Sequence, residues 1–415
     1  MIKRAVPVLF ASLALVAVSC GSDTVSEPAG TTAAGGTKPT DATTVAGGTT
    51  ASSDCVLDSP LKIGFAADLG ELGAFSDQPG SEAAQVMVDQ LNADGGVGGK
   101  PIEYVVKDIQ GDPATTQRAA QELLDSGVNA LIGPPFSSTG APLLDTVNGQ
   151  APVVFMASTD ATLADPARGG FLASFSDAVQ SSAMAEFALA QGYTKAITFS
   201  SADDVYFSGN PEFFADAFTQ GGGTMLGDFS FSLADADFST QVNAISNLAD
   251  KPEVLYTAMV MGQTQTLLEQ LKAAGLGDIV VMGADGFDAT VVWSAGDVAN
   301  GVFFAAHTFP QPDNGVEAFL QAATDAGKTI ETISFGALAA DAVQIIAAGV
   351  TQACSLDGPT VSAAIDNLVN LPVTTGSVTY KGTNGVPEKD VVVLTVQDGV
   401  PAFVEALRPT YIAGE

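Results

Sequence analysis

Residues 61–107 read LKIGFAADLGELGAFSDQPGSEAAQVMVDQLNADGGVGGKPIEYVVK. Leu61–Ala67 is a short apolar run, which predicts a buried strand, and Gly80–Asn92 carries its apolar side chains at helical spacing. Glycines between residues 95 and 99 mark a turn before a second apolar strand at Ile102–Lys107. A strand, a helix and a second strand in this order predict two parallel strands joined by a crossover helix.

The same alternation continues along the chain. Asp112 and Pro113 have the residue types of a helix start, with Asp112 as the N-cap. Further apolar strands are predicted at Ala130–Gly133, Val153–Ser158, Ala196–Ser201, Val254–Met259 and Ile279–Asp285. These strands are too numerous for one sheet, so the sequence predicts an α/β protein of two doubly wound lobes with parallel sheets.

The first residues indicate export from the cytoplasm. Lys3 and Arg4 precede an apolar run at Ala5–Val18, and small residues then lead to Cys20. The run is too short to span a bilayer comfortably, so residues 1–19 are predicted to be a lipoprotein signal peptide. The residues before Cys20 resemble a bacterial lipobox, which implies a lipid-modified Cys20. The alternative is an ordinary signal peptide with an incidental cysteine.

Residues 20–55 are predicted to be a flexible linker behind this lipid anchor. Most of them are Gly, Ser, Thr or Ala, a composition that cannot offset the entropy of folding. The chain as a whole has 47 acidic against 15 basic residues and a net charge of −32. Nucleic acids and anionic membrane surfaces would repel it, so membrane attachment requires the lipid. The expected location is extracytoplasmic, in the periplasm or at the outer face of the cytoplasmic membrane.

Two further cysteines, Cys55 and Cys354, lie just before the first predicted strand and just after a long predicted helix. Export implies an oxidising environment, so the two are expected either to form a disulfide or to remain as free thiols. Their separation does not resemble a metal site, and neither a metal nor a cofactor is expected.

Candidate ligand-binding residues follow the predicted strands, because ligands of open α/β sheets bind beyond the carboxyl ends of the strands. Hydroxyls, aromatic rings and one acid there suit a small zwitterion. Each of them could instead be a helix cap, a turn residue or part of the core. The set comprises Phe75, Ser137, Ser158, Thr159, Tyr206, Met259 and Asp285.

Catalytic machinery is sparse. The single histidine, His307, follows the apolar strand Val302–Ala306, and no Gly-x-Ser-x-Gly motif is present. A structural or hinge-facing role for His307 is favoured over general-base chemistry. The sequence therefore indicates a binding protein rather than an enzyme.

Three segments carry a family resemblance: LKIGFAADLGELGAF, NADGGVGGKPIEYVVKD and GDPATTQRAAQELLDSGVNALIGP. They resemble the opening of the branched-chain amino-acid-binding proteins, which have the type I periplasmic-binding-protein fold and serve ABC importers. The resemblance covers roughly residues 60–400. It implies three hinge crossings, near residues 171–177, 301–305 and 374–380. The implied lobes are residues 56–174 with 304–376, and residues 175–303 with 377–415.

The resemblance also implies roles for the candidate residues. Ser137, Ser158 and Thr159 match positions that hold the ligand carboxylate, and Asp285 matches the acid that receives the ammonium. Phe75 and Tyr206 match flanking aromatic positions. Two departures affect the choice of ligand: residues 259–261 read Met-Val-Met where the family often has an aromatic, and Asp285 replaces a longer Glu.

The implied function is capture of an amino acid or a similar small polar molecule by a monomer, which delivers it to the permease of an ABC importer. Two alternatives stay open. One is a ligand-sensing module of the same fold that signals to a membrane partner, and the other is a non-transport cell-surface lipoprotein.

Overall fold

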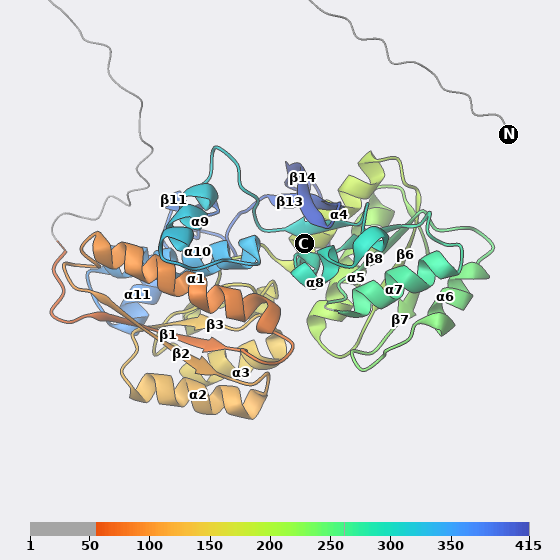
Figure 1. Ribbon diagram of the computed structural model, residues 1–415. Helices are drawn as coiled ribbons and strands as arrows, with labels where there is room; N and C mark the ends of the chain where they lie inside the picture. The colour runs from red at the N-terminus through yellow and green to blue at the C-terminus, as the bar shows by residue number, and fades with distance from the viewer. Residues whose placement is uncertain (1–54, 261, 415) are drawn as a thin grey trace, which may run out of the picture. The chain divides into compact units, whose positions relative to one another are not determined.

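The computed structural model describes residues 55–260 and 262–414. The predicted signal peptide, the lipidation site Cys20, most of the linker and Met261 lie outside the described residues. The described chain contains a five-stranded sheet, a seven-stranded sheet and a two-stranded hairpin. We call the elements around the five-stranded sheet the first lobe and those around the seven-stranded sheet the second lobe (Figure 1).

The sheet of the first lobe has five parallel strands in the order β2, β1, β3, β4, β5. They are β1 (Leu61–Ala67), β2 (Ile102–Asp108), β3 (Ala130–Gly133), β4 (Val153–Phe155) and β5 (Gly170–Leu172). One face is covered by α1 (Ala74–Ala93) and α10 (Ile333–Ala353), the other by α2 (Pro113–Asp125) and α3 (Ser137–Val147). With apolar cores on both faces, the strands read as near-continuous apolar runs rather than alternating ones.

Local chemistry sets where two of these helices begin. Asp112 caps α2, because its carboxylate accepts from the backbone N–H of Thr115 at 2.7 Å and Pro113 occupies the first helical position. Helix α1 begins at Ala74, earlier than its predicted start at Gly80. Asp77 in its first turn accepts from the backbone N–H of Asp68 at 2.8 Å, a contact between β1 and α1 that the apolar pattern does not reveal.

The sheet of the second lobe has seven strands in the order β14, β13, β10, β9, β8, β6, β7. They are β6 (Lys195–Ser200), β7 (Thr224–Ser230), β8 (Val254–Thr257), β9 (Val280–Gly283), β10 (Phe303–Ala306), β13 (Val391–Gln397) and β14 (Val400–Leu407). The predicted parallel pairing holds from β7 to β10, but β13 runs antiparallel to both β10 and β14. The sheet is therefore mixed rather than wholly parallel.

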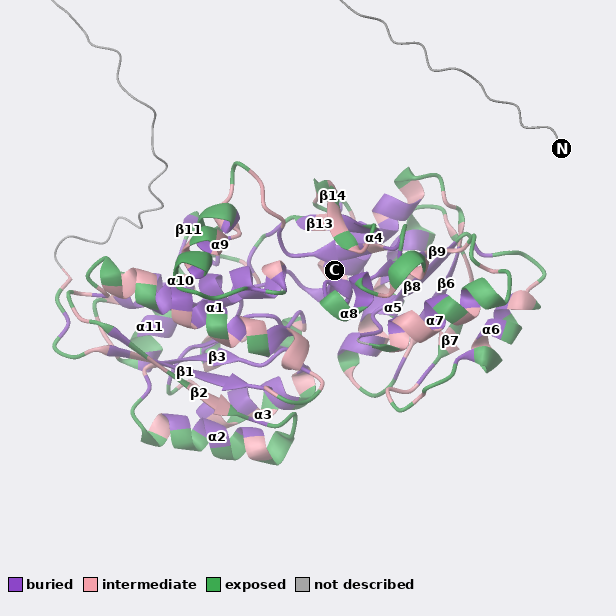
Figure 2. Cartoon of the chain, in the orientation of Figure 1, coloured by how far each residue is buried: buried purple, intermediate pink, exposed green. Residues whose placement is uncertain are grey.

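Helices again cover both faces of this second sheet. On one face lie α4 (Asp177–Ala190) and α5 (Val205–Gln220), and on the other α6 (Ser239–Ser246), α7 (Gly262–Ala273) and α8 (Thr290–Trp293). The inner strands are buried, whereas the edge strands β7 and β14 and the outer sides of helices such as α2 and α7 are partly exposed (Figure 2). The prediction of an α/β fold with two lobes is confirmed.

The remaining elements belong to the first lobe and its connections. They are α9 (Val316–Asp325), α11 (Gly358–Ile365), β11 (Leu371–Val373) and β12 (Gly376–Val378), with single turns of 3-10 helix at Ala161–Leu163 and Pro166–Arg168. Two further turns of 3-10 helix, Asp285–Phe287 and Gly296–Val298, belong to the second lobe. Among the described residues, α10 alone is long and apolar enough to cross a membrane, and 83% of its most apolar window is buried inside the protein.

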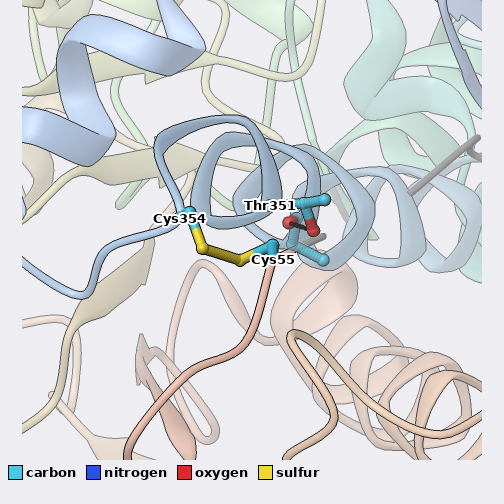
Figure 3. Close-up of a disulfide and its surroundings, with 4 residues drawn as sticks. Cys55, Thr351 and Cys354 are labelled. Carbon is cyan, nitrogen blue, oxygen red and sulfur yellow. Dashed lines mark hydrogen bonds between the residues drawn. A yellow bond between two sulfur atoms is a disulfide. The ribbon is translucent and has the colours of Figure 1, made fainter. Parts of the chain in front are cut away.

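A disulfide joins Cys55 to Cys354, with 5.4 Å between the Cα atoms (Figure 3). Cys354 is the residue at which α10 ends, in the left-handed conformation with φ of 44°. Cys55 lies six residues before β1. The bridge therefore fastens the start of the folded chain to the end of the central helix of the first lobe.

Two of the predicted lobe boundaries are displaced. Strand β10 pairs with β9 and β13, so residues 304–306 belong to the second lobe and the second crossing begins after Ala306. Strand β12 pairs with β11, and Tyr380, buried in the core of the first lobe, donates to the carbonyl of Leu172 at 2.6 Å. Residues 377–380 therefore belong to the first lobe, because strand pairing keeps each strand whole. The first crossing lies between Leu172 and Asp177.

Candidate functional site

Loops at the carboxyl ends of the two sheets contact each other. The backbone N–H of Ser138 in the first lobe donates to Asp204 Oδ2 in the second at 3.2 Å. The ring of Phe136 lies 5.9 Å from that of Tyr206 and 5.7 Å from that of Phe207, centroid to centroid. Because Phe136 follows β3 whereas Tyr206 follows β6, the structure brings together the two sides of the predicted site.

On the first-lobe side, two of the three predicted hydroxyls donate to acidic side chains. Ser137 Oγ donates to Asp160 Oδ2, and Thr159 Oγ1 donates to Asp177 Oδ1 at 2.6 Å. Ser158 is 1% exposed, and its hydroxyl has no partner among the described residues. Burial of an unpaired hydroxyl costs about 1–3 kcal/mol, which makes Ser158 a candidate for contact with a ligand.

On the second-lobe side, Asp285 is 3% exposed and is held by several contacts. Its Oδ1 accepts from the hydroxyl of Tyr206 at 2.8 Å, and its backbone N–H donates to Gln180 Oε1 at 2.9 Å. The backbone N–H of Gly286 donates to the same Tyr206 hydroxyl at 2.9 Å. A Cβ at residue 286 would lie 2.6 Å from the Val260 side chain, so this close approach requires glycine.

His307 contacts a predicted site residue, although the sequence alone favoured a structural or hinge-facing role for it. Its Nε2 lies 2.9 Å from Asp285 Oδ2, and its ring stacks on Phe175 at 4.0 Å between centroids. Burial lowers the pKa of His307, although the hydrogen bond to Asp285 opposes this effect. The histidine therefore orients the acid as a neutral ring. The strand-end rule would have found it, since His307 directly follows β10.

Two further buried acids lie close enough to Asp285 for its charge to affect their titration. Burial is the main cause that raises the pKa of Asp177 and of Asp288 to about 7 each, and the charge of Asp285 adds to both shifts. Asp177 Oδ1 also accepts from Asn210 Nδ2 at 2.7 Å. We call Asp177, Asp285 and Asp288 the acid cluster. Sequence reasoning missed Asp177 and Asp288, because burial was the property that distinguished them from ordinary loop acids.

The two apolar candidates occupy different places. Phe75 is half-buried and packs against the cores of both lobes, with its ring 5.2 Å from that of Phe335 and 6.5 Å from that of Phe136. Met259 is fully buried in the apolar core of the second lobe. Phe75 therefore lies where the lobes meet, whereas the printed contacts of Met259 indicate packing.

Five of the seven predicted site residues are buried, whereas Phe75 and Ser137 are partly exposed. Two cavities of about 600 and 640 Å³ lie elsewhere on the described chain, and none of the seven predicted residues lines either of them. The first is bordered by His307 and by residues of the later crossings, including Lys389, whose Nζ pairs with the buried Asp341 at 2.9 Å. All three members of the acid cluster are buried.

Comparison with known proteins places this geometry in a family. The family model described as "Periplasmic binding protein" matches residues 60–400, and the chain belongs to that family. Its members bind solutes outside the cytoplasm and are not enzymes, as the sequence predicted.

Two curated relatives confirm the resemblance to branched-chain amino-acid-binding proteins. The Leu/Ile/Val-binding protein BraC3 of Rhizobium johnstonii is 28% identical over 334 residues, which cover 78% of this chain and 88% of the relative. The Leu/Ile/Val-binding protein homolog 3 of Brucella melitensis is 26% identical and covers 82% and 92% of the two chains.

Solved structures share the fold. The leucine-binding protein LivK of Thermotoga maritima superposes with a TM-score of 0.77 at 23% identity, covering 84% of this chain and 99% of the other. A solute-binding protein of an ABC transporter from R. palustris, in complex with benzoate, gives a TM-score of 0.74 at 18% identity, with coverage of 86% and 98%. The same architecture thus accommodates ligands of different chemistry.

Proposed function

We propose that this protein captures a small polar molecule bearing an amino group between its lobes and delivers it to an ABC importer. The observation that carries the proposal is the position of Asp285. This buried carboxylate is oriented by His307 and by Tyr206, whose ring packs against Phe136 of the first lobe. A carboxylate accepts several hydrogen bonds, so each oxygen of Asp285 retains capacity for an ammonium.

The other predicted residues surround this acid. Tyr206 and Phe75 provide aromatic walls, and Ser137, Ser158 and Thr159 form the polar side in the first lobe. Met259 is assigned a packing contribution to the second-lobe wall. An aromatic and apolar lining with a few placed polar groups is typical of small-molecule sites.

The proposed setting is the outer face of a membrane. Residues 1–19 act as a signal peptide, Cys20 carries the lipid, and residues 20–55 form the tether. The two relatives described above are named as a Leu/Ile/Val-binding protein and a homolog of one, and several of the similar structures belong to ABC transporters. Uptake is therefore favoured over sensing or a purely structural surface role.

A thermal-shift screen of the purified protein against amino acids, amino-acid amides and small carboxylates tests the proposal. A true ligand at 100 times its dissociation constant stabilises the folded state by about 2.7 kcal/mol, which is readily visible as a higher melting temperature. A complete absence of shifts across the three classes would contradict ligand capture and favour the structural alternative.

A further inference from the structure

On the first-lobe side of the site, two hydroxyl groups already donate their hydrogen bonds to acidic side chains of the protein. Ser137 Oγ donates to Asp160, and Thr159 Oγ1 donates to Asp177 at 2.6 Å. A hydroxyl has one hydrogen to donate, so neither residue can donate to a ligand carboxylate while these bonds persist. These are two of the three hydroxyls that the family resemblance assigns to a carboxylate.

The N-terminus of α3, which lies beside these hydroxyls, also donates a hydrogen bond to an acidic side chain. The N–H of Ser138, at the N-terminus of α3, donates to Asp204 Oδ2 at 3.2 Å. The other oxygen of Asp204 accepts from the N–H of Tyr206 at 3.1 Å, which caps α5. One carboxylate is therefore shared between helix starts of both lobes, in the position where a ligand anion would be attracted.

Among the described residues, no lysine or arginine contacts the carboxylates of Asp160, Asp177, Asp204 or Asp285. The described hydrogen bonds and ion pairs of Asp160, Asp177, Asp204 and Asp285 come from hydroxyl, amide, backbone and imidazole groups, none from Lys or Arg. His307 is the one base in contact with the acid cluster, and its burial favours the neutral ring. The whole chain carries a net charge of −32, which attracts cations and repels anions at long range.

One donor remains free at this side of the site. The Ser158 hydroxyl is buried and has no partner among the described residues, although it lies next to Thr159 in the chain. A single hydroxyl can donate to a carbonyl oxygen or accept from an amide N–H, and therefore suits an uncharged polar group. It cannot by itself replace the set of donors that a carboxylate requires.

We propose that the ligand is a cationic amine without a free carboxylate, such as an amino-acid amide or a decarboxylated amino acid. The inference rests on the proposed function and narrows its ligand class. The ammonium lies against Asp285 and the other members of the acid cluster. The opposite end, which is a carboxylate in an amino acid, is uncharged and faces Ser158.

Two matched ligand pairs test the inference by isothermal titration calorimetry at neutral pH. Leucine and leucinamide differ in the carboxylate alone, and arginine and agmatine differ by its removal. We expect at least one pair to bind, and the member without the carboxylate to bind about tenfold or more tightly in every pair that binds. Placing two like charges together costs several kcal/mol, and 1.4 kcal/mol corresponds to a tenfold change in affinity. A tenfold preference is therefore a modest expectation.

A double variant separates the acids from other causes of selectivity. Asp160→Asn with Asp204→Asn removes two of the charges that face a ligand carboxylate, so the preference for leucinamide over leucine should shrink about tenfold. Asp125→Asn, at an exposed position at the end of α2, is the matched control and should leave the preference unchanged.

The outcomes distinguish the inferred ligand class from the proposed function of solute capture. Leucine binding as tightly as leucinamide, or more tightly, overturns the inference and leaves solute capture intact. An unchanged preference in the double variant overturns the role given to the acids. No binding by any of the four probes contradicts the proposed function as well.

Discussion

Asp285 is the residue on which ligand affinity should depend most. Asp285→Asn keeps the size of the side chain but removes the charge that would pair with an ammonium. We expect the affinity for an amine ligand to fall by about 2–5 kcal/mol, since a buried charged group would lose its partner. Calorimetry measures the change, and the exposed Asp125→Asn is the control. Equal affinities would remove Asp285 from the site.

The buried acids also predict a pH dependence of stability. The pKa of Asp288 is about 7 in the folded protein against an ordinary value of 3.8, so between these values the folded state binds more protons than the unfolded state. The contribution of Asp288 to the free energy of unfolding therefore falls as pH rises through this window, by up to about 1.4 kcal/mol per pH unit.

Asp288→Asn isolates this effect from the opposite contribution of His307, whose pKa is lowered. Relative to the parent protein, the variant should gain stability as pH rises from about 4 to 7, in urea unfolding measured at several pH values. Parallel pH profiles of the two proteins would show that Asp288 titrates normally.

At the residue scale, the sequence alone predicted which residues follow strand ends but not which side chains are their hydrogen-bond partners. Ser137, Tyr206 and Asp285 were predicted because they follow strands, and in the structure they lie beyond the ends of β3, β6 and β9. The bonds from Ser137 to Asp160 and from Tyr206 to Asp285 join residues 23 and 79 positions apart. Each pair joins two loops of the same lobe, and which loops meet depends on the strand order of that lobe, which local residue patterns do not specify.

At the scale of elements, the disulfide makes a measurable contribution. Replacing Cys55 and Cys354 together by serine should lower the free energy of unfolding by about 2–4 kcal/mol, because the bridge restricts the unfolded chain. Denaturant unfolding of the variant and of the reduced parent should agree. Identical stability of oxidised and reduced parent would contradict the expectation.

Ligand binding should survive the loss of this bridge. Helix α10 has 21 residues and is therefore about 30 Å long. Cys354 lies at its far end, whereas Phe335, which packs against Phe75, lies in its first turn. A parallel loss of ligand affinity would show that the bridge also shapes the site.

Strands and helices were predicted well where a buried strand gives a continuous apolar run or a helix begins with a capping residue. The apolar runs of β1, β3, β8 and β9 identify buried strands, and Asp112-Pro113 identifies the start of α2. Strand β13 was not among the predicted strands, and its direction could not have been predicted, because an apolar run such as Val391–Gln397 has the same composition in a parallel or an antiparallel pair. The crossings were displaced for a related reason: pairing partners, rather than local composition, determine where β10 and β12 belong.

At the scale of the whole molecule, membrane association is expected to depend on the sulfur atom of Cys20. Cys20→Ser removes the sulfur that would carry the lipid, and a chain of net charge −32 has no electrostatic attraction to anionic lipid. The variant should move from the membrane fraction to the soluble fraction, whereas Ser19→Ala should remain with the membrane. Retention of the Cys20 variant would contradict the lipid anchor.

The bridge between Cys55 and Cys354 also determines how a pull on the N-terminal side of Cys55 is carried. Both cysteines belong to the first lobe, so mechanical load arriving along the chain passes through sulfur into α10 and is shared with the lobe it supports. Strand β1 cannot be peeled from its sheet by such a pull. The second lobe lies outside this load path.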